Sequence, residues 1–299
     1  MHNTLIVLLG PTGVGKTDIS AAVAGHFGSE VISCDSRQFF SEMKIGTAVP
    51  SEELLKKIRH HFIRFLSVRD YYSASLFERD VLNLLPDIFS RNRIVVMAGG
   101  SGMYIDAVCN GIDDIPDIDP AIREKYVGKY NEEGLESLRI DLKMLDPEYY
   151  RKVDLRNHKR IIRALEICET TGRPYSSFLK KEKSVRDFRP VKIGLTMPRE
   201  ELYEKINLRV DRMIDQGLEQ EARDLFEMRH LNALNTVGYK EFFEYFANKL
   251  PYRNVVELIK RNTRRYAKRQ MTWWARDKDI RWFHPAQLSE ILGYLDGIV

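Results

Sequence analysis

One stretch near the start of the chain limits the possible folds more than any other, namely Gly10-Pro11-Thr12-Gly13-Val14-Gly15-Lys16-Thr17. It follows an apolar, β-branched run at residues 5–9 and precedes residues 18–24, which are typical of a helix. A strand, the pattern G-x-x-x-x-G-K-T and a helix in this order predict a phosphate-binding loop. The glycines allow a tight turn whose N–H groups face an anion, and the helix N-terminus adds partial positive charge.

This loop predicts the binding of a di- or triphosphate through residues 10–17. The Lys16 ammonium can reach the terminal phosphate, and the Thr17 hydroxyl can hold Mg²⁺. An ordinary Gly-rich turn is the alternative, and the flanking strand and helix disfavour it. The loop leaves open whose phosphate binds and which reaction follows.

Composition allows a large core and shows no membrane-spanning segment. The 299 residues are 43% hydrophobic and carry a net charge of +4. No run approaches the ~18 apolar residues of a membrane span, and residues 1–9 are interpreted as a strand rather than a signal peptide. Cys34, Cys109 and Cys168 are far apart, without a C-x-x-C spacing, and the histidines at 60 and 61 lack partner ligands. We therefore expect a reduced, cytoplasmic protein without a zinc site.

Two further strands are expected to point toward the phosphate-binding loop. The strand at residues 30–35 carries Asp35 at its carboxyl end, where ligands of open α/β sheets collect. A helix-capping role for Asp35 is the alternative. The strand at residues 93–98 ends in Gly99-Gly100-Ser101-Gly102, where many phosphate-loop hydrolases carry an acid that directs Mg²⁺. These small residues predict a site that a bulky group can approach closely.

Helices are expected at residues 51–60, 75–89 and 199–216, and Pro86 should kink or divide the second. Arg209 lies beside the apolar stripe of the third, which is a core face by default. A strand is expected at residues 191–197 and only helices after it.

The middle of the chain has a different character. An acidic, proline-punctuated linker covers residues 113–120, and helical segments follow at residues 121–132, 134–144, 147–153 and 157–171. The pattern predicts an α/β core of the P-loop nucleoside-triphosphate-hydrolase type with a parallel sheet, formed by residues 1–112 and 186–299. An all-helical insertion at residues 113–185 interrupts this core.

Positive charge gathers in two of the expected helices. In the insertion, Lys159, Arg160 and Arg163 lie within about one turn, and a solvated helix face explains them without any ligand. The helix at residues 251–276 is more basic, and residues 260–278 hold a single acid, Asp277. Aromatic side chains accompany its cations, namely Tyr266, Trp273 and Trp274. Basic and aromatic side chains together predict contact with nucleic acid.

Taken together, several segments resemble the bacterial tRNA dimethylallyltransferases, also called tRNA isopentenyltransferases, over almost the full chain. The loop at residues 10–17 has their form. Residues 35–38, 44–48, 99–104, 163–166, 237–241 and 266–273 are similar, in order, to their D-S-x-Q, D-I-G-T-A, G-G-T-G-L-Y, R-A-L-E, V-G-Y-K/R-E/Q and Y-A-K-R-Q-x-T-W segments. The chain departs from them at Ser101 for Thr, Phe40 for Tyr, Val49 for Lys and Arg64 for Asp.

The resemblance implies that residues 10–17 hold the diphosphate of dimethylallyl diphosphate, with Mg²⁺ on Thr17 and no ATP hydrolysis. The prenyl group would go to N6 of adenosine 37, beside the anticodon of tRNAs that read codons starting with U. The implied catalytic residues are Asp35 as general base, Thr17, Ser101 and Arg209. The implied tRNA-binding residues are Asp35, Ser36, Arg37, Gln38, Ser101, Arg123, Lys159, Arg160, Ile161, Ile162, Arg163, Asn235, Gly238, Tyr239, Lys240, Lys268 and Arg269.

Other activities stay open from the residues alone. A small-molecule or nucleotide kinase would use the same loop for ATP. Prenylation of free AMP or ATP would leave the helical insertion without a use, and a non-catalytic RNA-binding module would leave the loop unexplained. Our prediction is a cytoplasmic monomer, because no coiled-coil pattern is present. Its expected partners are dimethylallyl diphosphate and the anticodon stem-loop of tRNA.

Overall fold

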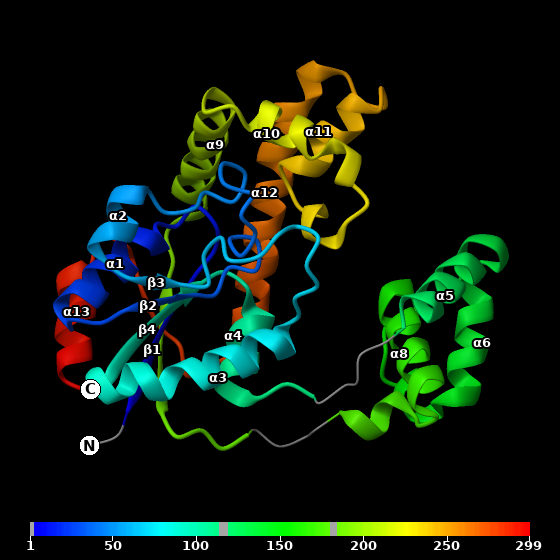
Figure 1. The fold of residues 1–299 in the computed structure, drawn as a ribbon, viewed down its shortest axis with the longest axis horizontal. Coiled ribbons are helices and arrows are strands. Elements are labelled where there is room, and N and C mark those ends of the chain that lie inside the picture. The colour runs from blue at the N-terminus through cyan, green and yellow to red at the C-terminus, as the bar shows by residue number, and fades with distance from the viewer. Residues whose placement is uncertain (1–2, 114–118, 180–183) are drawn as a thin grey trace. The chain divides into compact units, whose positions relative to one another are not determined.

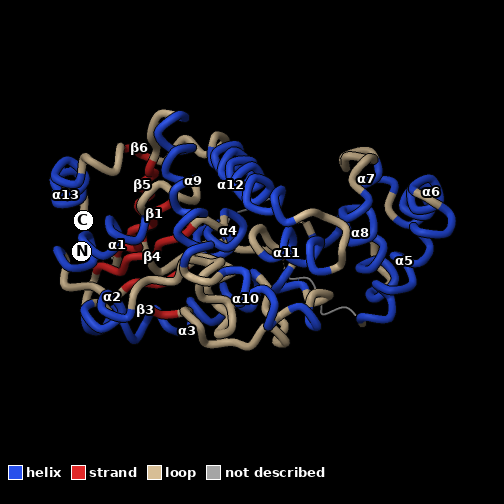
Figure 2. The backbone as a smooth tube through the Cα atoms, turned by 90° about the horizontal axis from the view of Figure 1, so that it is seen from above, coloured by secondary structure: helices blue, strands red, loops and turns tan. Residues whose placement is uncertain are grey.

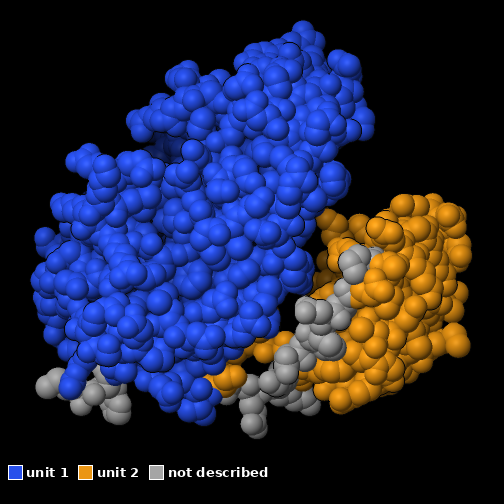
Figure 3. All heavy atoms as spheres, viewed as in Figure 1, with its two compact units in different colours: residues 1–109, 185–299 blue, residues 110–184 orange. Residues whose placement is uncertain are grey.

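The computed structural model describes residues 3–113, 119–179 and 184–299. The chain falls into two compact units, shown in blue and orange in Figure 3. Unit 1 comprises Met1–Cys109 and Val185–Val299, and unit 2 comprises Asn110–Ser184. The sequence analysis placed the insertion at residues 113–185, and most of the linker expected at residues 113–120 lies outside the described residues.

Unit 1 is built on a six-stranded sheet with the order β3-β2-β4-β1-β5-β6, in which every pairing is parallel (Figures 1 and 2). The strands are β1 (Thr4–Leu9), β2 (Val31–Ser33), β3 (His60–His61), β4 (Ile94–Gly99), β5 (Arg189–Leu195) and β6 (Arg281–Phe283). The predicted α/β core with a parallel sheet is thereby confirmed. The carboxyl ends of β1, β2 and β4 lie at the same end of the sheet, and the predicted site residues come directly after these strands.

Both faces of the sheet are buried, as the alternation along β1 shows. Leu5, Val7 and Leu9 belong to one hydrophobic cluster, whereas Ile6 and Leu8 belong to another. Successive side chains of a strand point to opposite faces, so a strand that is apolar at every position needs cover on both sides.

Helices provide that cover. The helices of unit 1 are α1 (Lys16–His26), α2 (Glu52–Lys57), α3 (Ala74–Arg91), α4 (Gly102–Asn110), α9 (Arg199–Asp215), α10 (Leu218–Asp224), α11 (Tyr239–Phe246), α12 (Tyr252–Trp274) and α13 (Leu288–Asp296). Apolar residues of α3, α4 and α11 belong to the cluster that contains Leu5, and those of α1 and α13 to the cluster that contains Ile6. No helix of the described ranges is long and apolar enough to cross a bilayer.

Three details differ from the sequence analysis. The helix expected at residues 51–60 ends at Lys57, because His60–His61 form strand β3. Strand β6 lies where only helices were expected. Both strands are two or three residues long and carry no apolar run. Pro86 does not divide its helix: it lies inside the single helix α3, where the buried Leu85 and Ile88 on either side of it hold the helix against the core.

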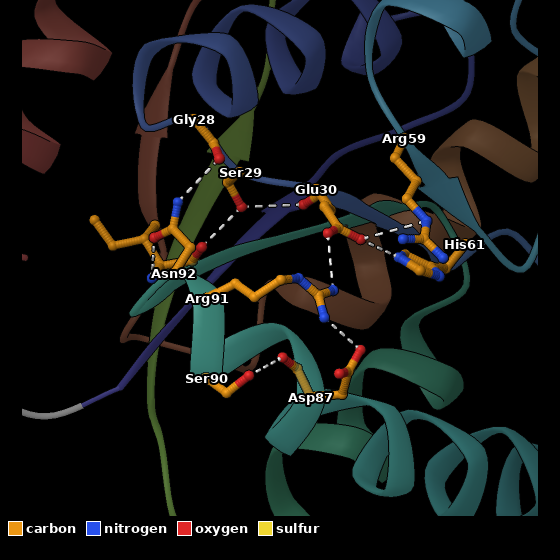
Figure 4. Close-up of polar contacts among 10 residues, drawn as sticks. Gly28, Ser29, Glu30, Arg59, His61, Asp87, Ser90, Arg91 and Asn92 are labelled. Carbon is orange, nitrogen blue, oxygen red and sulfur yellow. Dashed lines mark hydrogen bonds and ion pairs between the residues drawn. The ribbon is translucent and has the colours of Figure 1, made fainter.

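A polar network closes the amino-terminal end of β2 (Figure 4). Glu30 accepts hydrogen bonds from His61 Nε2 at 2.6 Å and from Arg91 Nη2 at 3.0 Å. Asn92 donates to the carbonyl oxygen of Gly28 at 3.0 Å. These contacts fasten β3 and the end of α3 to β2, at the sheet edge opposite the predicted site.

Unit 2 contains four α-helices among its described residues, namely α5 (Pro120–Glu133), α6 (Leu135–Leu145), α7 (Pro147–Tyr150) and α8 (His158–Thr171). Leu138 and Leu142 pack with Ile161 and Leu165 in its core. The fully buried Asp146 accepts hydrogen bonds from the N–H groups of Tyr149 and Ser176, so it caps α7.

Candidate active site

The phosphate-binding loop leaves β1 and enters α1 as the sequence predicts. Gly13 and Gly15 have φ values of 84° and 97°, which L side chains rarely adopt, and a Cβ atom at Gly13 would lie 2.8 Å from a side-chain carbon of Ile206. The Lys16 ammonium reaches back across the loop and donates to the carbonyl oxygens of Gly10 at 2.8 Å and Pro11 at 2.9 Å. The loop therefore surrounds its own cation.

A second cation lies against the same loop. Arg209 of α9 donates from Nη1 to Thr12 Oγ1 at 3.1 Å. Burial lowers the pKa of Lys16 to about 8, although Asp35 opposes the shift and Arg209 adds to it. Burial also lowers the pKa of Arg209, again against the effect of Asp35. Two partly buried cations that destabilise each other favour the binding of an anion beside them.

Asp35 follows β2 and lies where two cavities meet. It borders a small cavity together with Lys16 and Thr17, and a large cavity together with Arg209. Its Oδ1 accepts the backbone N–H of Arg37 at 3.1 Å, so it also stabilises its own turn. The described residues directly after Asp35 form no helix, so the alternative of a helix cap is wrong: the carboxylate stabilises a turn and still lies beside both cavities.

Ser101 connects this turn to the start of α4. Its Oγ accepts the backbone N–H of Ser36 at 3.1 Å and donates to Ser36 Oγ at 3.2 Å. Ser101 is 9% exposed, and it lines the large cavity with Ser36 and Arg37. Arg37 donates from Nη1 to the carbonyl oxygen of Ala233 at 2.9 Å, which orders the segment before α11.

The large cavity has a volume of about 710 Å³, which suits a ligand of nucleoside size. It collects predicted site residues from six separate segments of unit 1, namely Thr12, Asp35, Ser36, Arg37, Ser101, Arg209, Asn235, Gly238, Lys240 and Arg269. Val210, Met213 and Ile259 add apolar side chains to its lining. The cavity therefore offers polar, cationic and apolar walls at the edge of the sheet.

Three predicted RNA-binding residues of unit 1 lie elsewhere. Gln38 donates to the carbonyl oxygens of Thr47 at 3.2 Å and Ala48 at 3.1 Å, so it holds a loop. Lys268 is exposed on α12 outside the lining of the large cavity. Tyr239 is fully buried, so a direct contact with RNA is wrong for this conformation. Tyr239 and Phe242 are three residues apart, so they lie on the same face of α11, and that face packs into the core.

The predicted RNA-binding residues of unit 2 divide into three groups. Lys159 and Arg160 are exposed at the start of α8. Ile161 and Ile162 are 0% and 4% exposed, so their prediction as RNA contacts is wrong, because they form the core of this unit.

Two further cations of unit 2 share one buried acid. Arg123 and Arg163 lie 3.3 Å and 3.5 Å from the carboxylate oxygens of Glu166, which is fully buried. The acid holds both guanidinium groups at the surface of the unit, where they are 62% and 39% exposed.

Gln270 is a site residue that the sequence analysis did not select. Its Oε1 accepts the backbone N–H of Thr12 at 2.8 Å, and its Nε2 donates to the carbonyl oxygen of Gly100 at 2.8 Å. A Cβ atom at Gly100 would lie 2.4 Å from this Nε2, so a larger residue there would displace the amide of Gln270. The signal in the sequence was its place in the segment at residues 266–273, where it matches the Q of the family pattern Y-A-K-R-Q-x-T-W.

The oxygen donors near the loop suit Mg²⁺ that binds together with phosphate. Within the described residues, no three His, Cys, Asp or Glu side chains are grouped as a metal site. Mg²⁺ commonly takes only one or two protein oxygens and completes its shell with phosphates and water. Thr17 and Asp35 supply such oxygens at the small cavity.

Comparison with known proteins gives consistent matches. A family model described as IPP transferase matches residues 38–277. The tRNA dimethylallyltransferase 1 of Bacteroides fragilis is 52% identical over 296 residues, which cover 99% of this chain and 98% of that protein. A tRNA dimethylallyltransferase 1 of Porphyromonas gingivalis is 56% identical over 283 residues, which cover 95% of this chain and 94% of that protein.

Solved structures show the same likeness. The tRNA isopentenylpyrophosphate transferase of Bacillus halodurans aligns with a TM-score of 0.72 and 33% identity, covering 99% of this chain and 96% of that one. A eukaryotic dimethylallyltransferase acting on tRNA aligns with a TM-score of 0.78 and 26% identity, covering 99% of this chain and 78% of that one.

Proposed function

Because the chain belongs to the IPP transferase family, we propose that it is a tRNA dimethylallyltransferase. It transfers a dimethylallyl group from dimethylallyl diphosphate to N6 of adenosine 37 in tRNAs that read codons starting with U. The products are N6-dimethylallyladenosine and diphosphate. The observation that carries this proposal is the position of Asp35, which borders both the cavity beside Lys16 and the nucleoside-sized cavity.

The diphosphate would bind at residues 10–17 with Lys16 and Arg209 beside it. As the allylic C–O bond breaks, negative charge gathers on the leaving diphosphate. The two partly buried cations and the loop N–H groups stabilise that charge where it develops. Thr17 and Asp35 would hold Mg²⁺, which would supply further positive charge to the leaving group.

Asp35 would take the proton from N6. An exocyclic adenine amine is a poor nucleophile, because its lone pair is delocalised into the ring. Removal of its proton as the N–C bond forms is general base catalysis, and a carboxylate beside both substrates is suited to it. The proton goes to the carboxylate, the new bond joins N6 to the allylic carbon, and the electron pair of the C–O bond leaves with the diphosphate.

The target base has to leave its stack to reach the large cavity, at a cost of a few kcal/mol. Ser36, Arg37 and Ser101 would contact the extruded adenosine. Lys240, Lys268 and Arg269 would bind phosphates around it, which offsets that cost. In unit 2, the exposed Lys159 and Arg160 and the paired Arg123 and Arg163 would contact the anticodon stem-loop.

The test is isotope transfer from labelled dimethylallyl diphosphate with Mg²⁺, with unmodified tRNA and free AMP offered in parallel. Label at adenosine 37 of tRNA supports the proposal. Label in AMP alone would keep the diphosphate site and Asp35 but remove the RNA roles. Consumption of ATP without any label transfer would favour a kinase instead.

A further inference from the structure

The carboxylate of Glu221, on α10, holds a loop that begins far away in the sequence. It accepts the N–H of Lys44 at 2.9 Å, the N–H of Ile45 at 2.9 Å and the N–H of Gly46 at 3.0 Å. Three successive N–H groups around one anion form a nest, and hydrogen bonds to a charged acceptor are stronger than neutral ones. An internal carboxylate therefore fills an anion site made by the backbone.

Tyr239 supplies a fourth hydrogen-bond donor to the Glu221 carboxylate. Its hydroxyl donates to Glu221 Oε1 at 2.7 Å. Burial first, and the Glu221 carboxylate second, raise the pKa of Tyr239, so the phenol stays protonated and keeps donating. A Cβ atom at Gly46 would lie 2.6 Å from the Tyr239 ring, so the loop rests directly on this side chain.

The loop that Glu221 holds is a wall of the large cavity. Gly46 and Thr47 line that cavity together with Arg37. Gln38 holds the loop at its other end, through the carbonyl oxygens of Thr47 and Ala48. The wall is therefore fixed at both ends by side chains that lie outside the cavity lining.

We propose, on the premise of the function stated above, that Glu221 is a positioning residue for the target nucleotide of tRNA. It acts through residues 44–47, which it presents as one wall of the nucleoside-sized cavity. Glu221 lines neither cavity beside Asp35, so the diphosphate site does not depend on it. Its loss weakens the productive binding of tRNA and leaves the binding of dimethylallyl diphosphate unchanged.

The test compares Glu221→Gln with the matched control Glu219→Gln. Glutamine keeps the size of the side chain but replaces one acceptor with a donor, which then faces an N–H group. The control lies on the same helix, and its carboxylate pairs with Arg223 at 2.8 Å. We expect Glu221→Gln to raise KM for tRNA by about tenfold or more and KM for dimethylallyl diphosphate by less than about twofold.

Hydrogen exchange supplies a readout that does not depend on turnover. In Glu221→Gln, the amides of residues 44–46 should exchange about tenfold faster or more, while the amides of β1 stay protected. Tyr239→Phe removes one donor of four and should give a smaller change in both measurements. Gly46→Ala lifts the loop from the Tyr239 ring and should raise KM for tRNA in the same selective way.

Two results would overturn the inference. One is an unchanged KM for tRNA in a variant whose loop amides exchange faster. The other is an equal rise in both KM values, because the loop would then support the whole site. If Glu221→Gln does not fold, Tyr239→Phe and Gly46→Ala decide by the same measurements. A wild-type protein that transfers no label rejects the proposed function, whereas its hydrogen exchange still tests the anchoring of residues 44–46.

Discussion

The side-chain carbonyl of Gln270 accepts the backbone N–H of Thr12 at 2.8 Å, so α12 is hydrogen-bonded directly to the phosphate-binding loop. The nitrogen of the same amide donates to Gly100 at 2.8 Å. One amide thus connects two parts of the site. One is the loop proposed to hold the diphosphate, and the other is the run of small residues that lines the large cavity. Its two ends have opposite hydrogen-bonding character, so its orientation is fixed by its partners.

Replacement of this amide by a carboxylate should impair catalysis. In Gln270→Glu, the side chain still accepts from Thr12 but cannot donate to Gly100, and a charge is buried. We expect a loss of about 2 kcal/mol, or about 30-fold in kcat/KM. Steady-state kinetics check this against Gln216→Glu, an exposed position near the end of α9. Equal kcat/KM for the wild type and Gln270→Glu would show that the amide only fills space.

Asp35→Asn should separate binding from chemistry. Asparagine can still accept the N–H of Arg37, so the turn is retained. Without a base for N6, turnover should fall by about 10²–10⁴-fold while tRNA still binds. Single-turnover transfer and a tRNA binding titration measure the two effects. If turnover stays at the wild-type level, Asp35 has no part in the proton transfer.

Diphosphate affinity should depend on the ionisation of Lys16. The pKa of this ammonium is lowered to about 8 in the free protein, and only its charged form attracts the diphosphate. Affinity should therefore be full below pH 8 and should fall by up to about tenfold per pH unit above it. Titration with inorganic diphosphate between about pH 7 and 9.5 tests this, and Lys16→Met should remove the dependence. A flat profile in the wild type would mean that Lys16 keeps its charge throughout.

Glu30 should contribute to stability at neutral pH and lose that contribution in acid. Burial alone would raise its pKa, but the hydrogen bonds from His61 and Arg91 outweigh burial and lower the pKa below 4.5. A lowered folded-state pKa gives stability that is present above the unfolded pKa and lost as pH falls through the folded one. Glu30→Gln should have a lower Tm than the wild type at pH 7. Below about pH 4, where the wild-type carboxylate is protonated, the Tm values of the two proteins should approach each other. The highly exposed Glu227 offers a control, and an equal effect of Glu227→Gln would contradict the role of the network.

Neighbouring positions of α8 should respond differently to alanine. Ile161 is fully buried in the core of unit 2, so Ile161→Ala should cost about 2–5 kcal/mol of stability. Lys159 is exposed, so Lys159→Ala should keep the stability and weaken tRNA binding, with a shallower salt dependence. Chemical denaturation and tRNA titrations at several salt concentrations distinguish the two. Stability losses of similar size would mean that Lys159 has a structural role.

The sequence predicted the parts of the fold that rest on local patterns. The apolar run of β1 and the glycines after it determine the strand and the loop, and the structure has both. Strand β3 could not be predicted, because His60–His61 pair with β2 through backbone groups that any residue carries.

Side-chain partners were harder to predict than elements. Basic and aromatic residues of α12 suggested nucleic acid, but the contact of Gln270 with Thr12 joins residues 258 positions apart, and no local pattern encodes it. The same holds for Glu221 and the loop at residues 44–46. Tyr239 and Ile161 were selected by resemblance to family segments, and such segments do not tell surface residues from the core beneath them.

The order of the strands has a consequence for synthesis on the ribosome. Strand β1 lies between β4 and β5, yet all of unit 2 separates the latter two along the chain. When β4 has emerged and paired, the other edge of β1 has no neighbour until unit 2 has also been translated. At about 5–20 residues per second, that edge is open for several seconds. An unpaired apolar strand edge can pair with another nascent chain and start aggregation. Early folding of the helical unit, followed by rapid pairing of β5 with β1, would protect the nascent enzyme from this.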